Sequence, residues 1–219
     1  MRTTAETETP PPESLTSWAS KGAFWALVSN ITVSAVSFVG TAILARMLDP
    51  QDFGLLGMAV LVTGIVQLFG NLGLGGALIQ KKDVSQESLS TVFWVNVITG
   101  TALTLICIAV SPLAALFFRQ SAVQSILMLL SCTFLMSSLS SVHNTLVYKD
   151  LRMKQLAVIE ISTRFIRVLV MLMAAFWGFR VWSIVIGIVV ERFFKTAGLL
   201  LVFPWKPSLV FSRTKFNEP

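Results

Sequence analysis

Long runs of apolar residues, separated by short polar stretches, occupy the chain from about residue 22 to residue 203. A transmembrane α-helix needs about 20 consecutive, predominantly apolar residues. Six runs have that length and end at charged residues, proline or glycine: about 22–45, 54–79, 90–118, 123–147, 156–178 and 181–203. The pattern predicts an all-α polytopic membrane protein whose six transmembrane helices form one lobe, residues 22–203.

Polar segments flank this lobe. Residues 1–21 contain three consecutive prolines and no apolar stretch of the kind found in signal peptides, so they are expected to form a disordered cytosolic tail. Residues 204–219, at the other end, are expected to be a cytosolic linker or a truncated end.

Composition supports a membrane protein over a soluble one. Hydrophobic residues make up 54% of the chain and charged residues 13%, with a mean hydropathy of +0.76, whereas soluble domains are roughly a quarter charged. A soluble bundle of buried helices would need polar outer faces, for which too few charges remain. The net charge of +6 is scattered over short loops without a basic, aromatic-rich face, so no nucleic-acid partner is expected.

Lysine and arginine are distributed unequally between the two sides of the predicted lobe. One side, with both termini and the second and fourth connectors, holds ten: Arg2, Lys21, Lys81, Lys82, Lys149, Arg152, Lys154, Lys206, Arg213 and Lys215. The other side holds Arg46, Arg119 and Arg180. Because cytoplasmic loops are enriched in positive residues, both termini are expected in the cytoplasm.

The fifth predicted helix contains charged residues well inside its apolar run. In "EISTRFIR", Glu160, Arg164 and Arg167 are spaced i, i+4 and i+7 and so share one helix face. This spacing predicts that Glu160 pairs with Arg164. Counted inward from the residue after Lys154 at about 1.5 Å per residue, the two arginines lie roughly 13 and 18 Å deep.

The sixth predicted helix carries charges at similar depths. In "VVERFFKTAG", Glu191 and Lys195 are spaced i, i+4, and Arg192 lies about 100° around the helix from Glu191. Counted from residue 203, Glu191 is roughly 18 Å deep and Lys195 roughly 12 Å. Two neighbouring helices are therefore expected to bring their charges together.

Two interpretations of these charges remain open. They could form a self-neutralising structural network, or they could line a cationic, water-filled cavity open to the cytosol. An arginine at mid-membrane costs about 2.5–3.5 kcal/mol, and four bases face only two acids, which favours a cavity that attracts an anion such as a phosphate. The expected substrate-binding residues are Arg164, Arg167, Arg192 and Lys195, with supporting ion pairs from Glu160 and Glu191.

Uncharged polar residues also occur in the predicted helices. For each of them helix packing and substrate contact are both open interpretations: Asn30, Gln67, Asn71, Asn96, His143 and Asn144. Cys107 and Cys132 lie inside apolar runs and are expected to be packing residues, with no metal site, disulfide or cofactor. With one histidine, no DxD motif and no histidine–carboxylate pair at helical spacing, no catalytic residues are expected.

Glycine is concentrated near the end of the second predicted helix, in "FGNLGLGGAL". No strand precedes it and no Lys-Ser or Lys-Thr pair follows, so it is not a phosphate-binding loop. Small residues allow close helix contact or a bend. A gate or a packing site is therefore expected at Asn71, Gly73, Gly75 and Gly76.

Three segments together resemble a known family: "LARMLDPQDFGLLGMA", "LFGNLGLGGALIQKKD" and "LVYKDLRMKQLAVIEIS". They are similar to the polysaccharide and O-antigen (Wzx-like) flippases of the multidrug/oligosaccharidyl-lipid/polysaccharide exporter superfamily. The resemblance implies two six-helix lobes around a central cationic cavity. It also implies a flippase that moves undecaprenyl-diphosphate-linked oligosaccharide repeat units across the bacterial inner membrane for surface polysaccharide synthesis.

Such flippases usually have twelve or more spans, so this chain resembles an N-terminal lobe. Its implied partners are the lipid bilayer, the lipid-linked oligosaccharide, and a missing C-terminal lobe or a second copy. The alternatives are a small-molecule or drug exporter of the same superfamily and a non-transporting scaffold that gathers the polysaccharide polymerase and glycosyltransferases.

Overall fold

The computed structural model describes residues 12–70, 86–149 and 153–202, and all its regular structure there is helical. Six helices follow one another: α1 (Pro12–Met47), α2 (Pro50–Gly70), α4 (Gln86–Phe118), α5 (Ser121–Lys149), α6 (Met153–Phe176) and α7 (Val181–Val202). Each corresponds to one of the six predicted apolar runs. The predicted all-α class is thus confirmed.

Helix α1 begins ten residues before the predicted span. Residues 12–21 are helical, so the prediction of a disordered tail is wrong for this stretch. Pro12 stands at the first helical position, where its fixed φ suits a helix and its missing N–H costs nothing. The rest of the predicted tail, residues 1–11, and the predicted linker or truncated end, residues 204–219, lie outside the described residues.

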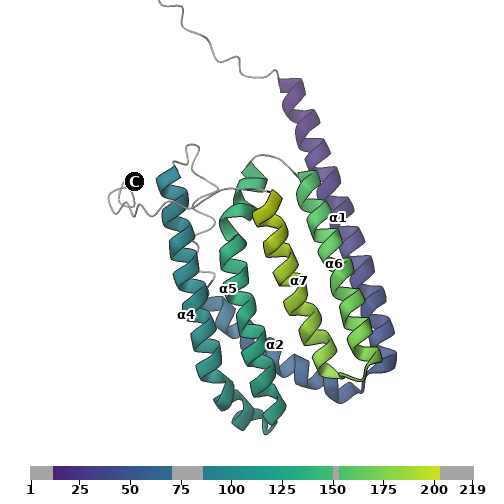
Figure 1. The fold of residues 1–219 in the computed structure, drawn as a ribbon. Coiled ribbons are helices and arrows are strands. Elements are labelled where there is room, and N and C mark those ends of the chain that lie inside the picture. The colour runs from purple at the N-terminus through teal and green to yellow at the C-terminus, as the bar shows by residue number, and fades with distance from the viewer. Residues whose placement is uncertain (1–11, 71–85, 150–152, 203–219) are drawn as a thin grey trace, which may run out of the picture.

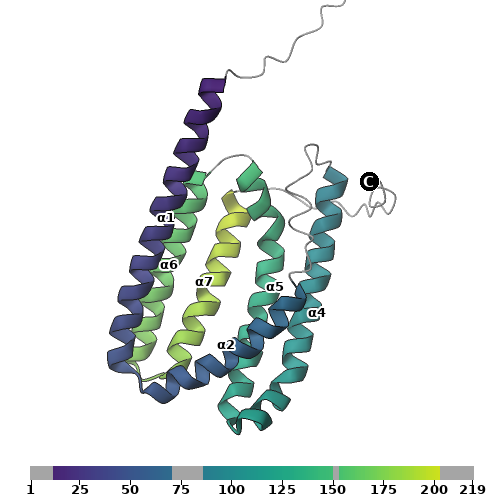
Figure 2. The ribbon, with the colours of Figure 1, turned by 180° about the vertical axis from the view of Figure 1, so that it is seen from behind.

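Five of the helices stand side by side in a row. Helix α1 packs against α6, α6 against α7, α7 against α5, and α5 against α4, as both views of the ribbon show (Figures 1 and 2). The α1–α6 contact is close at Gly40, where an added Cβ would lie 2.9 Å from Val168. The chain order thus differs from the spatial order, because α6 and α7 lie between α1 and α5.

Helix α2 runs obliquely across one face of this row (Figure 2). It contacts α4, α5 and α7. Leu56 of α2 and Ile188 of α7 pack against two apolar cores, one among α2, α4, α5 and α7 and the other among α1, α6 and α7. Helix α2 therefore ties the two ends of the row together.

Tight turns join α4 to α5 and α6 to α7, and both turns lie at the lower ends of the helices in Figure 1. After α4, Arg119 has a φ of 54° and the Gln120 N–H donates to the Ala115 carbonyl. After α6, Gly178 has a φ of 81° and the Phe179 N–H donates to the Ala174 carbonyl. Both are helix endings with a left-handed residue that satisfies otherwise free carbonyls.

Four of the described helices are long and apolar enough to cross a membrane: α1, α2, α4 and α5. Helices α6 and α7 are as long as a span, at 24 and 22 residues, but each carries three charged residues along its middle. Because they stand between α1 and α5 in the row, they cross the same layer. The protein is a multi-pass membrane protein.

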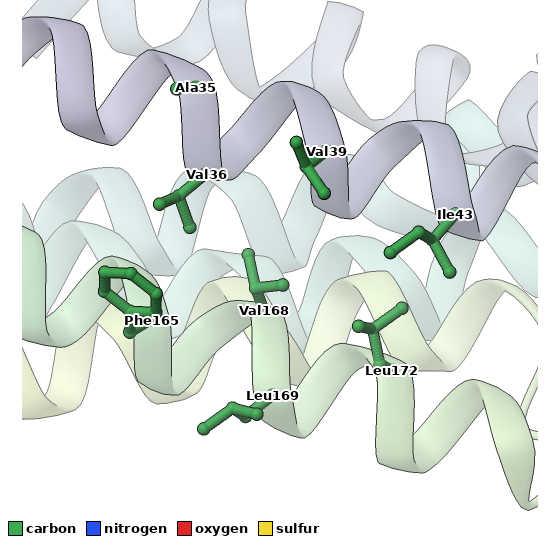
Figure 3. A pocket seen from close by; sticks show the side chains of 8 residues that line it. All are labelled: Ala35, Val36, Val39, Ile43, Phe165, Val168, Leu169 and Leu172. Atoms are coloured by element: carbon green, nitrogen blue, oxygen red, sulfur yellow. The ribbon is translucent and has the colours of Figure 1, made fainter.

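An apolar groove of about 380 Å³ separates parts of α1 and α6. Only hydrocarbon side chains line it, among them Val39 and Ile43 of α1 and Phe165 and Leu169 of α6 (Figure 3). Leu169 lies about 140° around α6 from Arg164 at 100° per residue. Such a surface suits contact with lipid chains.

Candidate functional site

The charged residues of α6 and α7 meet across the contact between the two helices. Glu191 accepts from two guanidinium groups: its Oε1 is 3.1 Å from Arg164 Nη2, and its Oε2 is 2.9 Å from Arg167 Nη1. These three side chains are between 12% and 23% exposed, so the pairs are partly shielded from solvent. The expectation that the two helices bring their charges together is confirmed.

Glu160 pairs across the helices instead of along its own helix. Its Oε1 lies 2.9 Å from Lys195 Nζ of α7, and its Oε2 accepts a hydrogen bond of 3.1 Å from the Ser29 hydroxyl of α1. The predicted Glu160–Arg164 pair is therefore wrong. The antiparallel α7 brings Lys195 level with Glu160 and Glu191 level with Arg164, and partners on a packed neighbour replace the partner one turn away.

Arg192 is separated from this network, in line with its predicted position about 100° around the helix. It is exposed and forms no ion pair with any residue that the structure describes. Instead it lines a pocket of about 210 Å³ together with side chains of α2, α4 and α5. The four predicted substrate-binding residues therefore divide into three paired bases and one unpaired base.

Both groups lie toward the side of the row that α2 crosses. Ile188 packs against the same two apolar cores as Leu56 of α2. It lies three and four residues before Glu191 and Arg192, on the same side of α7. Gln67 of α2 shares a pocket with Arg192. The side chains of the opposite side of α7, such as Phe193 and Leu201, are exposed and apolar.

The network remains cationic after pairing. Glu191 serves two arginines and Glu160 serves one lysine, so three bases stand against two acids. Arg192, which pairs with no carboxylate among the described residues, adds a fourth positive charge beside the network. Such a cluster is stable inside a membrane only where other groups or water offset its charge. Chemically, the surplus can attract an anion, and the guanidinium groups suit phosphate oxygens.

A second ion-pair cluster joins the turn between α1 and α2 to the turn between α6 and α7. Arg180 Nη2 is 2.8 Å from Asp49 Oδ2, and Arg180 Nε is 3.3 Å from Asp52 Oδ2. Arg180, which has a φ of 51°, directly precedes α7. No local sequence pattern predicts this contact, because over 120 residues separate the partners.

Other predicted positions have mixed outcomes. The proposed gate at Asn71, Gly73, Gly75 and Gly76 lies outside the described residues. Cys107 is fully buried in an apolar core, as expected of a packing residue, whereas Cys132 is exposed on α5. Within the described residues, no three histidine, cysteine, aspartate or glutamate side chains gather closely enough to hold a metal ion.

The fold and the site define a class: an all-α polytopic membrane protein with a cation-rich polar face on its central helices. Comparison with known sequences identifies the family. Residues 43–219, most of the chain, match the sequence model of a protein family whose description is "polysaccharide biosynthesis protein". The chain belongs to this family, which confirms the resemblance drawn from the three motifs.

Characterised relatives carry names from the same area of biology. The chain is 28% identical over 200 residues to the teichuronic acid biosynthesis protein TuaB of Bacillus subtilis, covering 90% of this chain and 41% of TuaB. It is 26% identical over 189 residues to the succinoglycan biosynthesis transport protein ExoT of Rhizobium meliloti, covering 86% of this chain and 38% of ExoT.

A third relative is the lipopolysaccharide biosynthesis protein WzxC of Escherichia coli, 24% identical over 141 residues, or 64% of this chain and 29% of WzxC. The chain thus spans about two fifths or less of the length of these relatives. No solved structure matches it.

Proposed function

We propose that the chain is one lobe of a flippase that moves lipid-linked oligosaccharide repeat units across the bacterial inner membrane during surface polysaccharide synthesis. The observation that carries the proposal is the cationic polar surface of α6 and α7, where three bases pair with two acids and Arg192 lines the neighbouring pocket beside α2. The family and the names of the relatives support the same role.

The substrate class follows from the chemistry of this face. An undecaprenyl-diphosphate-linked oligosaccharide carries two phosphates next to its sugars, and guanidinium groups bind phosphate oxygens through paired hydrogen bonds. Arg164, Arg167 and Lys195 bind the diphosphate in this proposal, while Glu160 and Glu191 hold the empty site together by ion pairs.

The orientation belongs to the proposal as well. The termini and connectors that hold ten lysines and arginines face the cytoplasm. The turns near Arg119 and Arg180 face the opposite side of the membrane. A second lobe, from the same polypeptide or from another copy, covers the charged face and completes the cavity. The substrate then enters from the cytosolic side.

The test uses the protein as its gene encodes it, expressed in its native cell. The triple variant Arg164→Gln, Arg167→Gln, Glu191→Gln removes both guanidinium groups without leaving Glu191 as an unpaired buried charge. We expect surface polysaccharide to be lost and lipid-linked repeat units to accumulate, while the protein remains in the membrane at its normal level.

Arg119→Gln is the matched control, because Arg119 is exposed and lies in the turn between α4 and α5. It should leave surface polysaccharide unchanged. Normal polysaccharide from the triple variant, at a normal membrane level, would remove the arginines from the mechanism.

A further inference from the structure

The pocket that holds Arg192 is a second polar site, distinct from the paired cluster of α6 and α7. Four helices contribute to it, and its lining includes Gln67, Asn96, Thr99, Ser137, Ser141 and Arg192. Most of these side chains are polar, and none of the lining residues that the structure describes is an aspartate or glutamate. In a protein that buries itself in lipid, so many hydrogen-bonding groups at one place call for a polar ligand or water.

Several of these groups are free to bind a ligand. Asn96 Nδ2 donates a hydrogen bond of 3.2 Å to Ser141 Oγ, which leaves the Asn96 amide oxygen as an acceptor. The side chains of Gln67, Thr99 and Ser137 make no hydrogen bond to any residue in the described ranges. Arg192 supplies guanidinium donors and has no carboxylate partner there.

The chemistry of the lining selects a class of ligand. Amides and hydroxyls can both donate and accept, as can the hydroxyls of a sugar ring. Because the described lining has no acid and includes Arg192, a cation is disfavoured. The guanidinium group of Arg192 can bind an anionic substituent. Leu103 and Phe134 add an apolar surface that suits the C–H face of a pyranose.

Size and position limit the ligand further. At about 210 Å³, the pocket is smaller than the roughly 300–1,000 Å³ of sites for drug-sized molecules. It therefore suits one sugar ring and not a whole repeat unit. Arg192 follows Glu191 directly in the chain, so a sugar there would lie next to the paired arginines.

We propose that this pocket binds a sugar of the lipid-linked oligosaccharide, with Arg192 and the amides of Gln67 and Asn96 contacting its hydroxyl or anionic groups. The inference rests on the proposed function, because the paired cluster beside it binds the diphosphate. It assigns sugar recognition to side chains of α2, α4 and α5 that the diphosphate site does not use.

The test measures cysteine accessibility in the purified protein, as its gene encodes it, in lipid nanodiscs. Ser137→Cys is introduced into a Cys132→Ala background, and its reaction with a charged maleimide is followed. Cys107 stays in place because it is fully buried. The two probes are undecaprenyl diphosphate alone and the undecaprenyl-diphosphate-linked repeat unit extracted from the host.

We expect the cysteine to react, and the sugar-bearing lipid at ten times its Kd to slow the reaction about tenfold. Undecaprenyl diphosphate alone should protect it far less. Gln51→Cys is the matched control, since Gln51 is exposed near the start of α2 and outside the pocket. It should react at the same rate with either probe.

Other outcomes overturn the proposal in distinct ways. No reaction at Ser137→Cys would mean that water does not reach the pocket, and reaction without protection would mean that no sugar binds. Equal protection by both probes would assign the pocket to the diphosphate. Thr99→Cys repeats the test should Ser137→Cys fail to fold. None of these results depends on transport, which the triple variant Arg164→Gln, Arg167→Gln, Glu191→Gln tests separately.

Discussion

The two ion-pair clusters of this protein are built with opposite charge balance. Between α6 and α7, Glu191 holds two arginines and Glu160 holds one lysine, so bases exceed acids. At the turns, Arg180 is held by Asp49 and Asp52, so acids exceed the base. The first cluster retains positive charge that can attract a ligand, whereas the second uses all of its positive charge to join two turns.

The clusters also differ in how evenly their members are shielded. Between α6 and α7 the paired side chains are all partly shielded, from 12% to 29% exposed. At the turns, Asp52 is 5% exposed while Asp49 is 70% exposed. The energetic cost of losing a carboxylate should therefore depend on which cluster, and which member, is changed.

The largest expected effect comes from Glu191→Gln. This change leaves both Arg164 and Arg167 without their carboxylate, and breaking a shielded pair costs about 3 kcal/mol of unfolding free energy. Glu160→Gln is the matched comparison and should cost about 1 kcal/mol, since only the flexible Lys195 loses its partner. Thermal unfolding in detergent micelles measures both. Equal losses would show that Glu191 does not organise the cluster.

A smaller effect is expected from Asp52→Asn at the turns. Asp52 is buried and accepts from Arg180 Nε, so its loss should lower the unfolding free energy by about 1.5 kcal/mol. Asp49→Asn should cost below about 1 kcal/mol, because that pair is exposed.

Salt sharpens this prediction. At 1 M ionic strength the screening length is about 3 Å, so salt should remove the Asp49 contribution and leave most of the Asp52 contribution. Denaturant unfolding at low and high salt separates the two. A larger loss for Asp49→Asn than for Asp52→Asn would contradict the geometry of the turn cluster.

The smallest expected effect is that of Ser29→Ala. The change removes the hydrogen bond to Glu160 Oε2, while Glu160 keeps Lys195, and should cost about 0.5 kcal/mol of unfolding free energy. The double variant with Glu160→Gln should lose less unfolding free energy than the two single variants do together, because both changes act on one contact. Full additivity would mean that α1 does not support the charged face through Ser29.

Sequence patterns were sufficient for the helices but only in part for the site. The spacing of Glu160, Arg164 and Arg167 correctly places them on one face, yet the partner of Glu160 is Lys195. For Gln67 and Asn96 the sequence left both helix packing and substrate contact open, and only the pocket that they share with Arg192 groups them. The pair between Arg180 and Asp52 had no local signal at all, since the partners are 128 residues apart.

The sequence by itself determined which segments are helices and that the chain is a multi-pass membrane protein. These properties follow from the length and polarity of single segments, because lipid forces each one to satisfy its own backbone. Only the tertiary structure decided that α6 and α7 stand between α1 and α5, which acid holds which base, and which base has no acidic partner among the described residues. Those outcomes depend on the order and rotation of packed helices, which residue spacing within one helix does not encode.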